Sequence, residues 1–121
     1  MLKEYKHVRQ IKGEAQRRWF ADRYFDLIVW LGDATTIIGF QLCYDIDSGH
    51  HALTWHQNSG YAHNRIDDGE NRPGKMKASP ILLPDGVFEY ERIAKKFEAE
   101  SQELEAWLSS FIYDKIMQYP M

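Results

Sequence analysis

The sequence holds a single cysteine and no long apolar run. Cys43 stands alone among 121 residues, which excludes an intrachain disulfide, a Cys-x-x-Cys redox pair and a cysteine-rich zinc site. The first residues lack the apolar core of a secretory signal, and no later run approaches the roughly 18 apolar residues needed to cross a bilayer. These absences predict a cytoplasmic protein without a membrane span.

Familiar catalytic motifs are also absent from the sequence. No Gly-x-Gly-x-x-Gly and no Gly-Lys-Ser/Thr phosphate loop occurs, so nucleotide binding of the usual kinds is not expected. Neither Ser48 nor Ser59 stands in a Gly-x-Ser-x-Gly elbow. Cys43 falls in a predicted strand, where a small buried thiol is the commoner role. Nucleophilic catalysis therefore has no support in these motifs.

What the sequence does contain is an ordinary globular composition. Hydrophobic residues make up 44%, aromatic residues 14% and charged residues 27%. This is enough apolar material for a core and too much for a disordered chain. No repeat or low-complexity segment divides the chain. We therefore expect one domain over residues 1–121.

Charge is distributed unevenly along the chain. Residues 1–23 hold seven Lys or Arg and three Asp or Glu, whereas the remainder holds eight and fifteen. The acidic remainder and a pI near 5.9 argue against nucleic acid as a partner. The basic region suggests contact with an anionic partner, such as the acidic part of another subunit. The residues that would make this contact are Arg9, Lys12, Arg17 and Arg18.

Several segments in the first half have the composition of strands. Tyr24 to Leu31 and Ile37 to Tyr44 are rich in β-branched and aromatic residues and are joined by a short turn, which predicts a hairpin. His51 to His56 follows a second turn and adds a third strand, which gives a meander. His7 to Lys12 and Arg17 to Ala21 are predicted as edge strands on the N-terminal side.

The second half predicts an irregular loop followed by helices. Residues 57–79 combine Gly and Pro with Asn, Asp and Lys, which predicts a long loop of the kind that often carries function. Apolar residues recur at helical spacing from Tyr90 to Phe97 and from 102 to 119, with Ser101 as the expected N-cap of the second helix. We expect an α+β fold: an antiparallel β-sheet, made of the central three-stranded meander and the N-terminal edge strands, covered on one face by two C-terminal helices, the last one long.

Alternation along the predicted strands sorts their side chains onto two faces. The face expected to pack on the helices holds Phe25, Leu27, Val29, Leu31, Ile38, Phe40 and Leu42. The reverse face holds Tyr24, Asp26, Ile28, Trp30, Ile37, Gln41, Cys43, Thr54 and His56. Large aromatic side chains mixed with a few polar groups are typical of a protein interface or a small-molecule site.

Histidine and acidic residues are concentrated after the meander. His50, His51, His56 and His63 are followed by Asp67, Asp68 and Glu70, and imidazole and carboxylate groups are common ligands of divalent metals. One interpretation is a metal-dependent hydrolase in which His56, His63 and Asp67 bind the ion. Glu70 or Asp68 would then act as general base. The alternative is an Asp-Gly turn with solvated acids, because no His-Glu-x-x-His pattern fixes a ligand pair.

The hypothesis that the sequence favours is a non-catalytic binding and assembly module without a cofactor. It would form a homodimer through the polar-aromatic face and the 57–79 loop, with a small-molecule ligand on this surface as the second option. The residues expected to make the contacts are Asp26, Trp30, Gln41, Thr54, His56, His63, Asp67 and Glu70. Whether the protein is an enzyme depends on the metal interpretation.

Five segments spread over most of the chain suggest relatives. They are DLIVW (26–30), GFQLCYD (39–45), ALTW (52–55), DDGE (67–70) and PILLPDG (80–86). Together they resemble a small family of bacterial proteins to which no activity is assigned. The resemblance implies a bacterial single-domain protein, and it implies no particular substrate, cofactor or catalytic residue.

Overall fold

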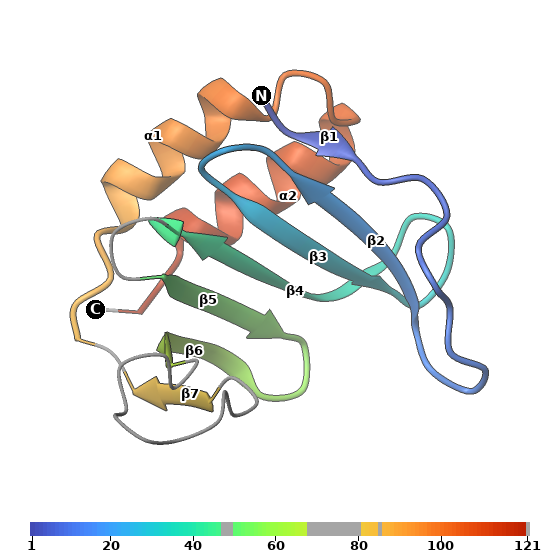
Figure 1. Ribbon diagram of the computed structural model, residues 1–121, viewed down its shortest axis with the longest axis horizontal. Coiled ribbons are helices and arrows are strands. Elements are labelled where there is room, and N and C mark those ends of the chain that lie inside the picture. The colour runs from blue at the N-terminus through green and yellow to red at the C-terminus, as the bar shows by residue number, and fades with distance from the viewer. Residues whose placement is uncertain (47–49, 68–80, 85, 121) are drawn as a thin grey trace, which may run out of the picture.

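The computed structural model describes residues 1–46, 50–67, 81–84 and 86–120. Within these residues one antiparallel sheet holds seven strands, each hydrogen-bonded to the next in sequence, and two helices follow (Figure 1). The strands are β1 (Lys3–Glu4), β2 (Gln16–Ala21), β3 (Asp26–Leu31), β4 (Ile37–Tyr44), β5 (His51–His56), β6 (Gly60–Asp67) and β7 (Ile81–Pro84). The helices are α1 (Tyr90–Glu100) and α2 (Ala106–Met117). The predicted α+β class, with an antiparallel sheet and C-terminal helices, is thus confirmed.

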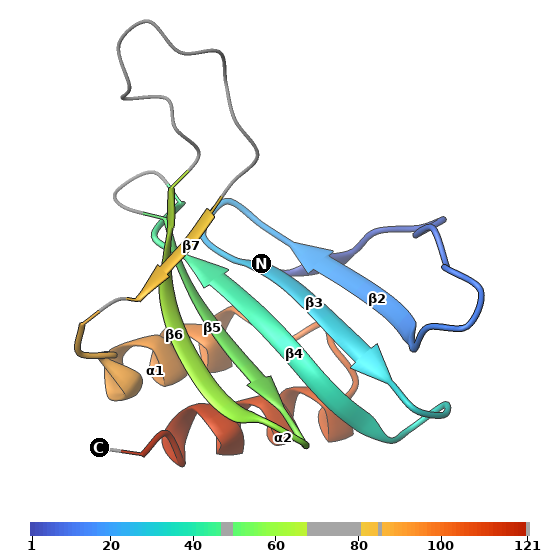
Figure 2. The ribbon, with the colours of Figure 1, turned by 90° about the horizontal axis from the view of Figure 1, so that it is seen from below.

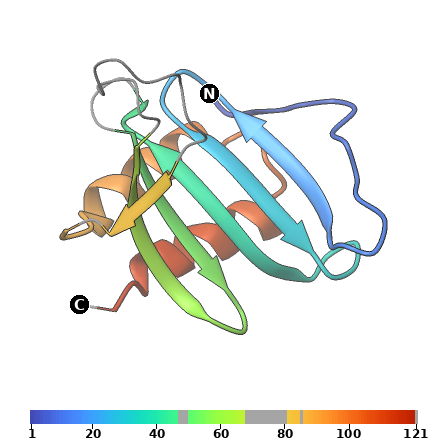
Figure 3. The same cartoon turned by 60° about the horizontal axis from the view of Figure 1, so that its bottom comes forward.

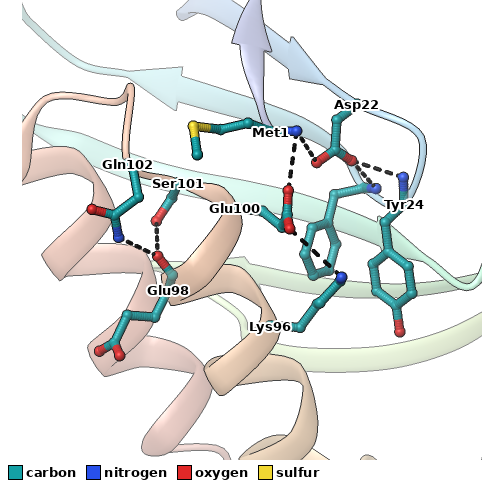
Figure 4. Close-up of polar contacts among 9 residues, drawn as sticks. Met1, Asp22, Tyr24, Lys96, Glu98, Glu100, Ser101 and Gln102 are labelled. Atoms are coloured by element: carbon teal, nitrogen blue, oxygen red, sulfur yellow. Dashed lines mark hydrogen bonds and ion pairs between the residues drawn. The ribbon is translucent and has the colours of Figure 1, made fainter.

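Turns with aspartate side chains connect the central strands. Between β2 and β3, the Asp22 carboxylate accepts hydrogen bonds from the backbone amides of Tyr24 and Phe25, at 2.8 and 2.7 Å (Figure 4). Between β3 and β4, Asp33 accepts bonds from two backbone amides of the following turn, at 2.9 and 2.8 Å. Aspartate favours such turns because its carboxylate pairs with amides that the sheet leaves unpaired. These bonds stabilise the two turns that join β2 to β3 and β3 to β4.

The hydrophobic core lies between the sheet and the helices. Both helices lie on the same side of the sheet, as Figure 2 shows. Leu27 and Val29 of β3 belong to the same buried cluster as Phe97 of α1 and Ile112 of α2. All four have 0% exposure. Burial of apolar surface on this scale is the main force that holds the helices against the sheet.

Ion pairs tie the first two strands to the helical layer. Arg18 of β2 donates to both carboxylate oxygens of Glu4, at 2.8 and 2.7 Å, and to both of Glu105, at 2.8 and 3.0 Å. The bonds to Glu4 and then to Glu105 raise the pKa of Arg18 above its ordinary value. The Met1 amino group lies 3.0 Å from Glu100 at the end of α1 (Figure 4). Arg18 is therefore engaged with two carboxylates of its own chain, and its predicted contact with an anionic partner stays a prediction.

A β-bulge changes the faces at the start of β4. Trp30 pairs with Gly39, whereas the next residue, Leu31, pairs with Ile37, so β4 has one extra residue at this point. Because side chains alternate along a strand, the extra residue exchanges the faces beyond it. Ile37 is therefore buried in the core at 6% exposure, and Ile38 is only half-buried. The predicted assignment of these two isoleucines to faces is wrong.

The segment from His7 to Lys12 is not the edge strand that its alternation predicts. His7 has a φ of 62°, which lies outside the extended region. The side chain of Gln10 takes the place of a neighbouring strand, because it accepts a hydrogen bond from the Arg17 amide at 2.8 Å and donates to the Arg17 carbonyl at 2.9 Å. Residues 5–15 therefore form an N-terminal arm beside β2.

The second half departs from its predicted structure in two places. The loop predicted for 57–79 is in part strand, because β6 pairs along β5, and residues 68–80 lie outside those described. The final helix begins at Ala106 rather than at 102, because Ser101 is the C-cap of α1 and not the N-cap of α2. Neither helix of the described residues is long and apolar enough to cross a membrane.

Candidate functional site

Among the described residues no helix lies over the face of the sheet opposite α1 and α2, and we call it the open face. Figure 3 views the molecule from this side, with the helices behind the strands. The strand register sets three rows of side chains across the open face. The first row is Arg17, Trp30, Gly39 and His56, the second is Trp19, Ile28, Gln41 and Thr54, and the third is Ala21, Asp26, Cys43 and Ala52.

The first row brings Trp30 and His56 together over Gly39. A Cβ atom added to Gly39 would lie 3.0 Å from the His56 ring and 3.4 Å from the Trp30 ring, so the missing side chain makes room for both. The backbone amide of Asn58 donates to His56 Nδ1 at 3.2 Å. In the neutral imidazole Nε2 then carries the proton. The row therefore offers an aromatic surface beside a hydrogen-bond donor.

The second row is uncharged along its whole length. Gln41 Nε2 donates to Thr54 Oγ1 at 3.0 Å, which orients the amide along the row. Ile28 and Trp19 supply apolar area beside it, and Trp19 is 37% exposed. Hydrogen-bonding and apolar groups thus lie side by side in the middle of the open face.

Asp26 lies in the third row, and the other two rows contain no acidic residue. The indole Nε1 of Trp19 donates a hydrogen bond to its carboxylate, and the edge of the Tyr5 ring packs on Trp19 with centroids 5.6 Å apart. Asp26 pairs with Cys43 across the strands. Burial first, and then the charge of Asp26, raises the pKa of Cys43 to about 12. The thiol therefore stays protonated near neutral pH and is a poor nucleophile.

The structure brings five of the predicted contact residues together on the open face, namely Asp26, Trp30, Gln41, Thr54 and His56. It places His63 elsewhere, because His63 pairs with Leu53 and so faces the helices, where it is 8% exposed. His63 Nδ1 donates to the Gly86 carbonyl at 3.0 Å, and the Tyr44 hydroxyl lies 2.5 Å from Nε2. In the neutral imidazole Nε2 is then the acceptor of the Tyr44 proton, since a carbonyl only accepts. The predicted place of His63 on the contact surface is wrong.

The predicted metal ligands His56, His63 and Asp67 do not form one site. His56 pairs with Gly60, three residues before His63, so the two imidazoles lie on opposite faces of the sheet. The backbone of Asp67 lies in β6, and Asp68 and Glu70 lie outside the described residues. In the part of the chain that the structure describes, no three His, Cys, Asp or Glu side chains are grouped so that they could hold a metal ion.

A network on the helix side was missed because its members are far apart in the sequence. The Tyr24 hydroxyl donates to Asp45 at 2.6 Å, and Arg92 of α1 donates to Tyr24 at 2.8 Å and to Asp45 at 3.1 Å. Burial raises the pKa of the Asp45 carboxyl, but the bonds from Tyr24 and Arg92 outweigh it and lower that pKa below its ordinary value. Lys96 lies 5.0 Å above the Tyr24 ring. Tyr24 therefore faces α1, and its predicted place on the reverse face is wrong.

A pocket at the margin of the open face was also missed. It has a volume of about 370 Å³ and is lined by residues 5–9 of the N-terminal arm together with Arg17, Trp19 and Ile28 of the sheet. Its walls come from the N-terminal arm and from the sheet. The alternation of residues 7–12 predicts that this part of the arm is an edge strand. A strand in that position would leave no pocket, so the sequence gives no sign of it.

Comparisons with known proteins identify no relative of this chain. No protein-family model matches it, and neither a curated protein nor a solved structure is similar to it. The resemblance to a bacterial family therefore stays a prediction. The function has to be inferred from the open face, the pocket and the fold that positions them.

Proposed function

We propose that the chain is a non-catalytic binding and assembly module that forms a homodimer through its open face. The observation that carries the proposal is the order of the rows: one with the cation Arg17, one without charge, and one with the anion Asp26. Consider a two-fold axis that lies between the two faces and runs along the middle row. It places the first row of each copy over the third row of the other copy. Positive and negative ends then meet across the interface.

The middle row suits the position of the axis. Residues on a two-fold axis meet their own copies, so charged side chains there would repel one another. Gln41 and Thr54 are uncharged, and a primary amide both donates and accepts hydrogen bonds. Gln41 can therefore bond to Gln41 of the second copy, while Ile28 packs on Ile28. Face-to-face packing with nearly aligned strands is a common arrangement of antiparallel sheets.

An axis parallel to the strands fits the same face less well. It would lay the row of Arg17 over the same row of the second copy, which offers no anion to Arg17. Asp26 would likewise meet the third row, which offers no cation. The charge pattern thus selects the axis that crosses the strands. A cytoplasmic location, which the single unpaired cysteine favours, belongs to the same proposal.

Substitution of one tryptophan on each side of the molecule tests the proposal. Trp30→Lys places a charge in the first row of the open face, and Trp107→Lys makes the same change on α2, where Trp107 is 36% exposed. Sedimentation velocity is expected to give a dimer for the wild type and for Trp107→Lys, and a monomer for Trp30→Lys. Circular dichroism and thermal unfolding of each variant verify that the fold is retained.

The proposal has two ways to fail in this experiment. A wild-type protein that sediments as a monomer at the highest concentration it tolerates would overturn the homodimer. A folded Trp30→Lys variant that remains dimeric, while Trp107→Lys becomes monomeric, would move the interface from the open face to the helical face.

A further inference from the structure

We propose that the pocket between the N-terminal arm and β2 binds a small apolar carboxylate, such as an aromatic or short acyl acid. Its volume of about 370 Å³ lies within the range of small-molecule sites in proteins. The pocket lies at the edge of the open face, beside the outer end of the middle row. It shares Arg17, Trp19 and Ile28 with the open face, but the argument for it does not require a dimer.

The pocket is preformed because the arm is held against the sheet at both ends. At one end the Tyr5 amide donates to the Trp19 carbonyl at 2.8 Å, and the Tyr5 ring packs edge-on against the indole. At the other end the side chain of Gln10 makes two hydrogen bonds to the backbone of Arg17. A pocket that exists before the ligand arrives costs little ordering energy on binding.

The pocket combines an apolar floor with a cationic rim. Ile28 and Trp19 form the sheet side, and Tyr5 and Val8 form part of the arm side. Lys6, Arg9 and Arg17 contribute positive charge, and of the described residues that line the pocket none is Asp or Glu. A ligand with an apolar body and one negative charge matches both parts.

Arg17 gives the strongest reason for an anion. One Nη2 hydrogen bond goes to the Arg9 carbonyl at 2.5 Å. Its Nε atom is buried and has no hydrogen-bond partner within the described residues. An unpaired donor on a buried charged group is unfavourable. A carboxylate in the pocket brings the opposite charge next to the Arg17 guanidinium, whereas a neutral ligand supplies no charge.

Calorimetric titration with simple acids tests the site. The probes are phenylacetate and hexanoate, and phenylacetamide is the uncharged control of nearly the same shape. Saturable binding of the two acids is expected, with the amide at least about tenfold weaker, which corresponds to about 1.4 kcal/mol. Binding of the amide as tightly as phenylacetate, or no saturable binding of either acid, overturns the proposal.

Variants locate the binding and separate it from dimerisation. Val8→Trp fills the pocket and is expected to abolish binding, and Arg17→Met is expected to weaken it by about tenfold. Lys95→Met removes one positive charge from the exposed side of α1 and is expected to leave the affinity unchanged. The same titration on Trp30→Lys keeps the two proposals apart, because Trp30 does not line the pocket. Acids that bind Val8→Trp as well as the wild type place the site elsewhere and overturn the proposal.

Discussion

Trp30 of β3 and His56 of β5 flank Gly39 of β4, and their rings occupy the space that a side chain at Gly39 would need. A Cβ atom there would lie 2.9 Å from the Trp55 carbonyl oxygen, a backbone atom that cannot move aside without shifting β5. Gly39→Ala is therefore expected to lower the free energy of unfolding by about 1–3 kcal/mol, the usual range for overpacking. Urea unfolding followed by circular dichroism measures the change.

Gly86→Ala is the matched control for Gly39→Ala. A Cβ atom at Gly86 meets no atom of the described residues within 4 Å, and the backbone there is not in the left-handed region. The substitution is expected to be neutral or to stabilise slightly, because alanine has fewer unfolded conformations than glycine. Equal destabilisation by both substitutions would show that the close approach of Trp30 and His56 does not account for the cost at Gly39.

The unfolding free energy is expected to fall in acid through the Asp45 and Glu105 carboxyls. Bonds from Tyr24 and Arg92 hold the pKa of Asp45 below its ordinary value against the effect of burial. The bond from Arg18 does the same for Glu105. A carboxyl with a lowered folded-state pKa stabilises the fold above the unfolded pKa of about 4, and this contribution is lost as the pH falls through the folded pKa. Urea midpoints at a series of pH values below 5 measure the loss.

Arg92→Met tests the part of this effect that belongs to Asp45. Without the guanidinium the pKa of Asp45 moves back towards its ordinary value, so the variant is expected to lose less stability in acid than the wild type does. Lys95→Met removes the same charge from the same helix, at an exposed residue, and is expected to retain the wild-type pH dependence. Identical pH dependence in all three proteins would rule out the contribution of the Arg92 contact.

The sequence predicts those parts of the fold that depend on local pattern. Strict alternation from Phe25 to Leu31 predicts the core face of β3. It also places Trp30 on the opposite face, because buried and half-buried residues alternate without a break along β3. The change of face at Ile37 depends on a β-bulge. A bulge is a property of how two strands pair, so the sequence of one strand does not reveal it.

Contacts between distant segments account for the features that sequence reasoning missed. The N-terminal arm leaves the sheet because the Gln10 side chain bonds to Arg17, a contact that alternation cannot reveal. The pocket depends on that departure. On the helix side, the bond of Asp45 to Arg92 joins residues 47 positions apart. Such partners are selected by tertiary packing rather than by local propensity.

Cys43 is expected to react slowly with thiol reagents in the folded protein. Burial, together with the neighbouring charge of Asp26, raises the pKa of its thiol to about 12, and the reactive species is the thiolate. Labelling by iodoacetamide at pH 8 is expected to be at least about a hundredfold slower in the folded protein than in guanidinium chloride. Mass spectrometry of quenched samples follows the reaction. Labelling at similar rates in both states would contradict the burial of this thiol.

Gln41 provides the sharpest test of the axis proposed for the homodimer. A residue on a two-fold axis meets its own copy, so Gln41→Lys and Gln41→Glu each place like charges together and are both expected to be monomeric. An equimolar mixture of the two variants pairs opposite charges at the same point and is expected to form a heterodimer. Sedimentation of each variant and of the mixture measures this. A mixture that stays monomeric while both variants remain folded would place Gln41 away from the axis.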